Sequence, residues 1–142
     1  MTTVEQMLKA KGSEIYAIEP DEPVLEAIQM MADHHIGALL VMRGEQLSGI
    51  VSERDYARKV VLLGRSSADT PVWQIMSSPV TSVARHATVH ECLALMTASR
   101  IRHLAVVERE QVLVMLSIGD CVKAVIDEQQ HHIDDLERFI RS

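Results

Sequence analysis

The sequence predicts an α/β fold made of two tandem β-α-β-β-α repeats and a long C-terminal helix. Shifting the chain by 65 positions aligns residues 15–61 with residues 80–126 without a gap, and 11 of the 47 pairs are identical. A further 13 of the remaining 36 pairs are apolar in both copies, so the hydrophobic pattern repeats together with the identities. A duplication that keeps its hydrophobic phase over this length predicts two copies of one structural unit.

The elements of each repeat follow from the spacing of its apolar residues. A short extended segment precedes a helix with apolar residues on one face, and two apolar strands joined by a polar turn come next. A second helix is predicted after Ser52 and after Ser117, and a match of 4–8 to 72–76 adds a short leading helical turn to each repeat. The predicted segments are 15–18, 24–35, 38–42 and 47–51 in the first repeat, and 80–83, 89–96, 104–107 and 112–116 in the second.

The domain boundaries follow from this repeat. We expect the first repeat at residues 3–64, a polar linker at 65–71, the second repeat at 72–127 and a helical extension at 128–142. A unit of about 60 residues buries only about 60% of the surface of its unfolded chain, so one repeat alone would be marginally stable. Packing of the two sheets, related by an approximate two-fold axis, is the expected remedy.

The end of the chain has its own pattern, in which apolar or neutral residues are spaced alternately by four and three positions. This heptad-like spacing predicts that the last helix continues past the second repeat to about Arg141. A helix of about 20 residues on so small a protein is expected to pack on a partner chain, and folding back over its own domain is the alternative. The residues of the pattern are Val122, Ile126, Gln129, Ile133, Leu136 and Ile140.

Composition excludes several classes of protein. Hydrophobic residues make up 47% and charged residues 24%, the balance of a globular chain rather than a disordered one. No apolar run approaches the ~18 residues of a membrane span, and the N-terminus lacks the apolar stretch of a signal peptide. A net charge of −6 argues against broad binding to a nucleic-acid backbone but leaves room for a local basic pocket. The two cysteines are too few for a disulfide scaffold and lack the spacing of a zinc site. We therefore expect a cytoplasmic protein with no metal site.

Two tetrapeptides hold equivalent positions, each after a buried strand and at the start of a helix: residues 52–55 (SERD) and 117–120 (SIGD). A serine with an acid three residues later is a helix-capping arrangement, which alone explains such a pattern in many proteins. The same geometry suits a ligand, because free helical N–H groups attract an anion and a carboxylate accepts hydrogen bonds from the vicinal hydroxyls of a ribose. Both interpretations are open at this stage.

A second pair of equivalent segments, 36–39 (IGAL) and 101–104 (IRHL), lies where the first helix ends and the central strand begins. Main-chain groups left open at a strand start can line a flat apolar ring with polar edges. Basic side chains nearby suit a phosphate, although a solvated helix face is the alternative for those on the second helix. These basic residues are Arg54, Arg58, Lys59, Arg102 and His103.

The segments GIVSERD (49–55) and IRHLAVV (101–107), set in a duplicated β-α-β-β-α unit, strongly resemble the cystathionine-β-synthase-type (CBS) domain pair over residues 3–127. More narrowly, the chain resembles small stand-alone CBS-pair proteins of bacteria. The resemblance implies a regulatory module rather than an enzyme, with a cleft between the repeats that binds AMP, ADP, ATP, NAD or a related adenosine compound. It also implies a homodimer, and since the chain has no room for a catalytic or DNA-binding domain, the effector would be a separate protein.

The resemblance also implies roles for particular residues. The motif aspartate holds the ribose hydroxyls, the motif serine lies near ribose or phosphate, the strand start lines the adenine through its main chain, and basic side chains there meet phosphate. Carried onto this sequence, the implied ligand-binding residues are Ile36, Gly37, Ala38, Ser52, Arg54, Asp55, Ile101, Arg102, His103, Ser117, Gly119 and Asp120.

The two repeats depart from the family pattern to different extents. Gly49 of the first repeat corresponds to Val114 of the second, and Arg54 corresponds to Gly119. We therefore expect two unequal clefts, with the first repeat closer to the family pattern. The alternative to a nucleotide sensor is a dimerisation or protein-interaction module whose clefts bind no ligand.

Overall fold

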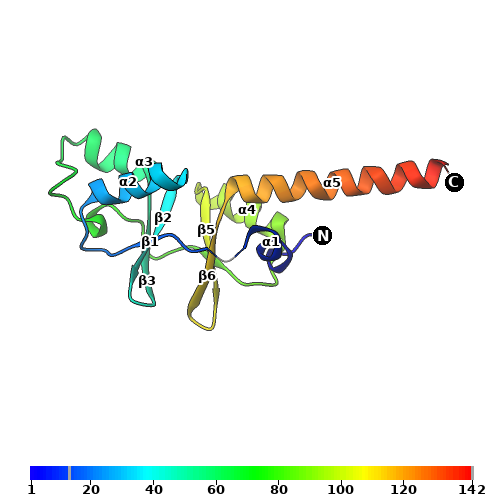
Figure 1. The fold of residues 1–142 in the computed structure, drawn as a ribbon, viewed down its shortest axis with the longest axis horizontal. Coiled ribbons are helices and arrows are strands. Elements are labelled where there is room, and N and C mark those ends of the chain that lie inside the picture. The colour runs from blue at the N-terminus through cyan, green and yellow to red at the C-terminus, as the bar shows by residue number, and fades with distance from the viewer. Residues whose placement is uncertain (13, 142) are drawn as a thin grey trace. The chain divides into compact units, whose positions relative to one another are not determined.

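The computed structural model describes residues 1–12 and 14–141, which form two compact units. One is built mainly from the first repeat and is called the first-repeat unit, and the other is built mainly from the second repeat and is called the second-repeat unit. Each contains a three-stranded sheet with helices (Figure 1). The order β-α-β-β-α occurs in both, so the predicted fold class is confirmed.

The first-repeat unit contains β1 (Ala17–Ile18), α2 (Val24–His34), β2 (Ala38–Arg43), β3 (Gln46–Ser52), α3 (Glu53–Tyr56), a π-helical turn (Ala57–Val61) and a 3₁₀ turn (Val72–Gln74). Its strand order is β1-β2-β3, with β1 parallel and β3 antiparallel to β2. Ala38 of β2 is paired with Ser52 of β3, so the start of the central strand lies beside the start of the second helix.

The second-repeat unit contains α1 (Val4–Lys11), β4 (Ser82–Val83), α4 (Val89–Ser99), β5 (His103–Glu108), β6 (Gln111–Ser117) and α5 (Ile118–Arg141). Its strand order is β4-β5-β6, and β4 runs parallel to β5. A capping box starts α4, because Oγ1 of Thr88 accepts a hydrogen bond from the N–H of Glu91 and the Glu91 carboxylate accepts one from the N–H of Thr88. The heptad-like spacing correctly predicted that α5 reaches Arg141.

The leading segment α1 lies in the second-repeat unit, although it precedes the first repeat in sequence. Val4 is fully buried and shares a core with Val89 and Leu104. The N–H of Val4 donates to the carbonyl of Ala87 at 2.8 Å, which fixes α1 beside the start of α4. Residues 3–12 are predicted to belong to the first repeat, and the structure differs there, because α1 has its apolar and backbone partners in the second-repeat unit.

The leading segment of the second repeat makes the converse arrangement. Val72 is fully buried in the core of the first-repeat unit with Val24 and Leu39. Its N–H donates to the carbonyl of Glu22 at 2.9 Å. Each repeat is therefore completed by a leading segment that comes before the other repeat in sequence. Among the helices of residues 1–12 and 14–141, none combines the length and the hydropathy needed to cross a membrane.

Candidate functional site

The serine–aspartate motif of the first repeat forms a capping box at the start of α3. The backbone N–H and the hydroxyl of Ser52 both donate to Oδ2 of Asp55, each at 3.0 Å. The N–H of Asp55 donates back to Oγ of Ser52 at 3.1 Å. The capping interpretation is confirmed, and the box fixes the Asp55 carboxylate at the helix start.

Asp55 is also paired with Lys59, one helical turn further along. Nζ of Lys59 lies 3.2 Å from Oδ1 of Asp55 and donates to the carbonyl of Ile75 at 2.9 Å. The side chain of Asp55 is only 14% exposed, and that of Lys59 is 42% exposed. The lysine therefore joins the motif carboxylate to a backbone carbonyl and keeps a positive charge beside the helix start.

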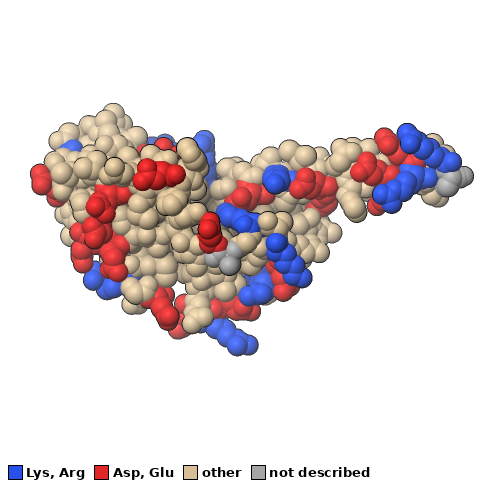
Figure 2. All heavy atoms as spheres, viewed as in Figure 1, with Lys and Arg blue, Asp and Glu red and all other residues tan. Residues whose placement is uncertain are grey.

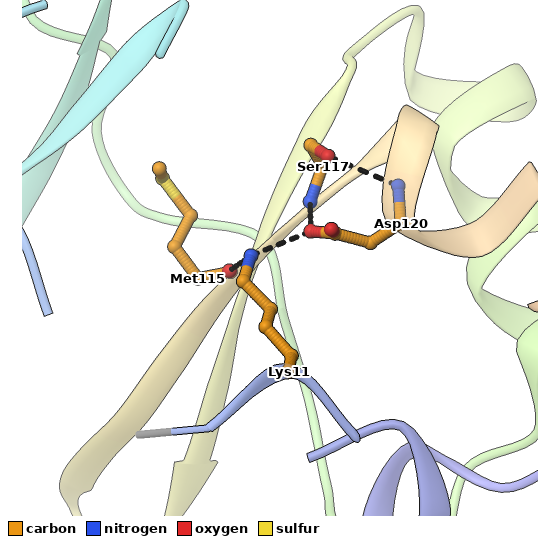
Figure 3. A network of polar contacts seen from close by, with 4 residues as sticks. All are labelled: Lys11, Met115, Ser117 and Asp120. Atoms are coloured by element: carbon orange, nitrogen blue, oxygen red, sulfur yellow. Dashed lines mark hydrogen bonds and ion pairs between the residues drawn. The ribbon is translucent and has the colours of Figure 1, made fainter. Parts of the chain in front are cut away.

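The second repeat has the same arrangement, but its lysine comes from α1 (Figure 3). The N–H of Ser117 donates to Oδ2 of Asp120 at 2.8 Å, and the N–H of Asp120 donates to Oγ of Ser117 at 3.1 Å. Nζ of Lys11 lies 2.5 Å from the same Oδ2 and donates to the carbonyl of Met115 at 2.7 Å. In both repeats a lysine thus joins the motif aspartate to a backbone carbonyl.

The charge on Asp120 is stabilised by these neighbours. Partial burial on its own raises the pKa of Asp120, but the hydrogen bonds from Lys11 and Ser117 and the positive charge of Lys11 outweigh it. The pKa of this carboxyl therefore lies below its ordinary value, and Asp120 is ionised at neutral pH. Among the described residues none donates a hydrogen bond to Oδ1 of Asp120, so this oxygen retains its acceptor capacity.

The two strand starts lie directly against the helix starts. The N–H of Glu53 donates to the carbonyl of Gly37 at 3.0 Å, and the N–H of Ile118 donates to the carbonyl of Arg102 at 2.8 Å. We expected open main-chain groups at these strand starts, and for these two carbonyls that expectation is wrong, because the first N–H of the following helix occupies each one. The same bonds bring segment 36–38 to the first motif and segment 101–103 to the second.

The remaining predicted residues differ in exposure. Ile36 and Gly37 line a shallow hollow of about 330 Å³ together with residues of α2 and Glu53. Ala38 is fully buried. Ile101 is partly buried and packs against the core of the second-repeat unit. The exposed members of the set are Arg54, Arg102 and Gly119.

His103 lies in the electric field of the second motif. Burial lowers the pKa of His103, and the positive charges of Lys11 and Arg102 lower it further, against a smaller opposing effect of Asp120. His103 is therefore neutral at pH 7. A neutral imidazole offers one donor and one acceptor rather than a fixed positive charge, so the cations beside this motif are Lys11 and Arg102.

Comparison with known proteins identifies the family. The model of the CBS domain matches residues 10–62 and again residues 72–127. The chain belongs to the CBS-domain family. It carries two CBS domains in tandem, so the CBS pair that the motifs resemble is confirmed.

This CBS pair is similar to three proteins that differ in source and in degree of identity. The "CBS domain-containing protein CBSX3, mitochondrial" of Arabidopsis thaliana is 37% identical over 99% of this chain and 72% of its own length. The structure of a protein with CBS domains from Burkholderia ambifaria superimposes with a TM-score of 0.87 at 50% identity, covering 90% of this chain and 96% of that one. A CBS domain protein from Pyrobaculum aerophilum, solved in complex with AMP, superimposes with a TM-score of 0.72 at 26% identity, covering 83% and 88%.

Gly49 of the first CBS domain has a structural role within its own unit. A Cβ at this position would lie 2.7 Å from Sδ of Met76 and 2.8 Å from the carbonyl oxygen of Ser77. The absence of a side chain lets Ser77 pair with Ile50, through N–H···O bonds of 2.8 and 3.1 Å. Val114, the corresponding residue, is buried in the core of the second-repeat unit. The glycine therefore serves the approach of the chain's own backbone, and this difference does not by itself make the two CBS domains unequal as binding sites.

Lys11 is the site residue that the sequence analysis missed. It lies 109 positions before Asp120, and the shifted alignment of the leading segments matches only residues 4–8 with 72–76. No counterpart of Lys11 therefore stands out in the second leading segment. Lys59 is one of the basic residues predicted to suit a phosphate, and its i,i+4 spacing from Asp55 is a local signal for the ion pair that the structure shows.

Proposed function

We propose that this CBS pair is a regulatory module that binds an adenine nucleotide and transmits its occupancy to a separate effector protein. The observation that carries the proposal is the repeated serine–aspartate–lysine arrangement, found in both CBS domains at the junction of a strand start and a helix start. Membership of the CBS family and the AMP complex of the Pyrobaculum aerophilum relative support an adenine nucleotide as the ligand.

The proposed roles follow from the chemistry of each group. Asp55 and Asp120 accept hydrogen bonds from the ribose hydroxyls, since an ionised carboxylate has about four acceptor positions and the capping box uses only part of them. The ribose can therefore bind without opening the box. Ile36, Gly37 and Ile101 line the base, and Ser52 and Ser117 lie near the ribose or the first phosphate.

Positive charge beside each carboxylate favours an anionic ligand over a neutral nucleoside. Lys59 in the first CBS domain and Lys11 in the second approach the motif acid directly. Arg54 and Arg102 are exposed and contribute further donors for phosphate. We expect His103 to assist as a neutral hydrogen-bond donor or acceptor.

The test is a thermal-shift titration of the full chain with AMP, ADP, ATP and NAD, with guanosine monophosphate as the control. A ligand at 100 times its Kd stabilises the folded state by about 2.7 kcal/mol, which corresponds to a rise in Tm of roughly 5–10 °C for a chain of this size. Adenine compounds should raise the Tm, and the guanine compound should raise it much less. The absence of any shift at millimolar concentration would reject the nucleotide proposal.

One observation favours a second candidate, a protein-interaction module without a ligand. In both CBS domains the motif acid already has a serine and a lysine as partners within the chain. Such a module would show no nucleotide-dependent shift, and its association with other chains would depend on the surface of α5 and not on Asp55 or Asp120.

A further inference from the structure

The long helix α5 presents an apolar edge to solvent. Four large aliphatic residues are 58%, 47%, 50% and 80% exposed: Ile126, Ile133, Leu136 and Ile140. With Val122 and Gln129 they are spaced alternately by four and three positions, which places all six on one edge of the helix. These six residues are called the α5 seam.

The second-repeat unit covers a different face of α5. Cys121, Ala124 and Val125 pack into the core of that unit. At about 100° per residue, the centre of this covered face lies about a quarter turn or more away from the α5 seam. The large aliphatic residues of the seam therefore keep about half or more of their surface exposed, and Figure 1 shows that α5 continues well past α4. The seam spans 19 residues from Val122 to Ile140, or about 27 Å along the helix axis.

The identities of the seam residues point to one partner. In heptad notation, the three isoleucines of the seam occupy a positions: Ile126, Ile133 and Ile140. The d positions are occupied by Val122, Gln129 and Leu136. β-branched residues at a with leucine at d favour parallel two-stranded coiled coils. We propose that α5 forms a parallel two-stranded coiled coil with α5 of a second copy of this chain.

The charges and the single polar seam residue support the parallel orientation. In a parallel pair, Gln129 meets Gln129 of the partner subunit, so two amides hydrogen-bond to each other. His132, at a g position, then faces Glu137 of the partner subunit, at an e position, which is a complementary pair when the imidazole is protonated. The seam itself carries no charge, and the basic side chains Arg138 and Arg141 lie at the far end of α5 (Figure 2).

The antiparallel orientation would form one additional kind of ion pair, but it would bury amide groups without hydrogen-bond partners. It would pair Lys123 with Glu137 of the partner subunit twice, but surface ion pairs contribute little. It would also place Gln129 against Ile133 of the partner subunit twice, which buries two amides without hydrogen-bond partners. Because an unsatisfied buried amide outweighs an exposed ion pair, the parallel register is favoured.

The proposed α5 pairing does not depend on nucleotide binding. It nevertheless affects where the proposed nucleotide sites of the two chains lie. α5 begins at Ile118, and its first turn contains Asp120 of the second motif. A shift of that first turn is passed along the same rigid helix to the seam. A parallel pair therefore places the second motifs of two chains at the same end of one coiled coil.

The first test is the oligomeric state of the full chain by sedimentation equilibrium. Ile133→Asp buries two carboxylates in one apolar layer and should weaken the dimer by roughly 100-fold or more. The matched control is His131→Asp, which places the same charge on the outer face of the helix and should leave the dimer intact. A monomeric unmodified chain, or equal weakening by both variants, would overturn the proposal.

The orientation is tested by oxidative cross-linking in the presence of the two buried native cysteines. Leu136→Cys should form a covalent dimer with itself, because identical d positions face each other in a parallel pair. In an antiparallel pair, Leu136→Cys would instead cross-link to Ile126→Cys when the two variants are mixed. Cross-linking only in the mixture, or in neither sample, would reject the parallel coiled coil even where a dimer persists through other surfaces.

Discussion

The ammonium group of Lys11 lies 2.5 Å from a carboxylate oxygen of Asp120, although 109 positions separate the two residues in the chain. The contact joins α1 to the first turn of α5 and holds the motif acid of the second CBS domain in its ionised form. In the first CBS domain the motif acid is paired with Lys59, which comes from the π-helical turn directly after α3. Two different chain segments thus supply the same charge to equivalent motifs.

We predict that Lys11→Met destabilises the protein in a pH-dependent way. Because the folded-state pKa of Asp120 lies below its ordinary value of about 3.9, the carboxylate contributes stability above about pH 4, and this contribution is lost as the pH falls through the folded-state pKa. The pair is partly exposed, so the expected loss at pH 7 is only about 0.5–1 kcal/mol. Urea denaturation at pH 7 and at pH 3 measures this difference, which should be smaller at the lower pH.

The matched control for Lys11→Met is Arg43→Met. Arg43 lies 2.9 Å from Asp21, but both side chains are more than half exposed. Such a pair is largely solvated, so its removal should change the stability by no more than a few tenths of a kcal/mol at either pH. Equal losses in the two variants would mean that Lys11 has no special effect on Asp120.

The repeated parts of this fold could be predicted from sequence, because local pattern encodes them. Helical spacing from Val24 onwards and the apolar strands beginning at Ala38 and Leu104 fix the order of elements. The capping boxes at Ser52 and Ser117 follow from serine–aspartate spacing alone. In each of these cases the interacting residues lie within a few positions of one another.

The contacts that could not be predicted are non-local. Nothing in the pattern around Val4 indicates that α1 packs with Val89 rather than with the repeat that follows it. The contact of Lys11 could not be predicted for the same reason, because its partner Asp120 lies more than a hundred residues away in sequence. The role of Gly49 also depends on a distant segment, Met76 and Ser77, whose approach only the folded chain reveals.

We predict opposite effects of alanine at two glycines. Gly49→Ala would place a Cβ within 2.8 Å of a backbone oxygen, so the pairing of Ser77 with Ile50 must shift, at a cost of roughly 1–3 kcal/mol. Gly119→Ala lies in the first turn of α5, where the nearest atom would be 3.6 Å away, and it should stabilise the helix by roughly 0.5–1 kcal/mol. Thermal unfolding of the two variants measures both signs, and a destabilising Gly119→Ala would contradict the open space at that position.

We predict that His103 makes the protein less stable as the pH falls below neutrality. Its folded-state pKa is lowered by burial and by nearby positive charge, so below the ordinary value of about 6.5 the unfolded chain binds a proton that the folded chain does not. Stability is therefore present above about pH 6.5 and declines as the pH falls toward the folded-state pKa. His103→Gln should flatten this decline in denaturation measured from pH 7 to pH 5. If the dependence of stability on pH is the same in His103→Gln as in the unmodified protein, other titrating groups cause the decline.

We predict that Asp55→Ala weakens nucleotide binding more than Asp120→Ala. Both changes remove a carboxylate that we propose accepts the ribose hydroxyls, and the loss of a charged hydrogen bond corresponds to roughly 10–100-fold in Kd. The first motif carries an additional exposed cation, Arg54, where the second has Gly119, so more of the affinity should depend on the first motif. Calorimetric titration with AMP and ATP gives the two Kd values, with Asp127→Ala as a control on an exposed acid outside the motifs. A larger loss for Asp120→Ala would reverse the ranking, because Lys11 and Arg102 would then provide the stronger phosphate contacts.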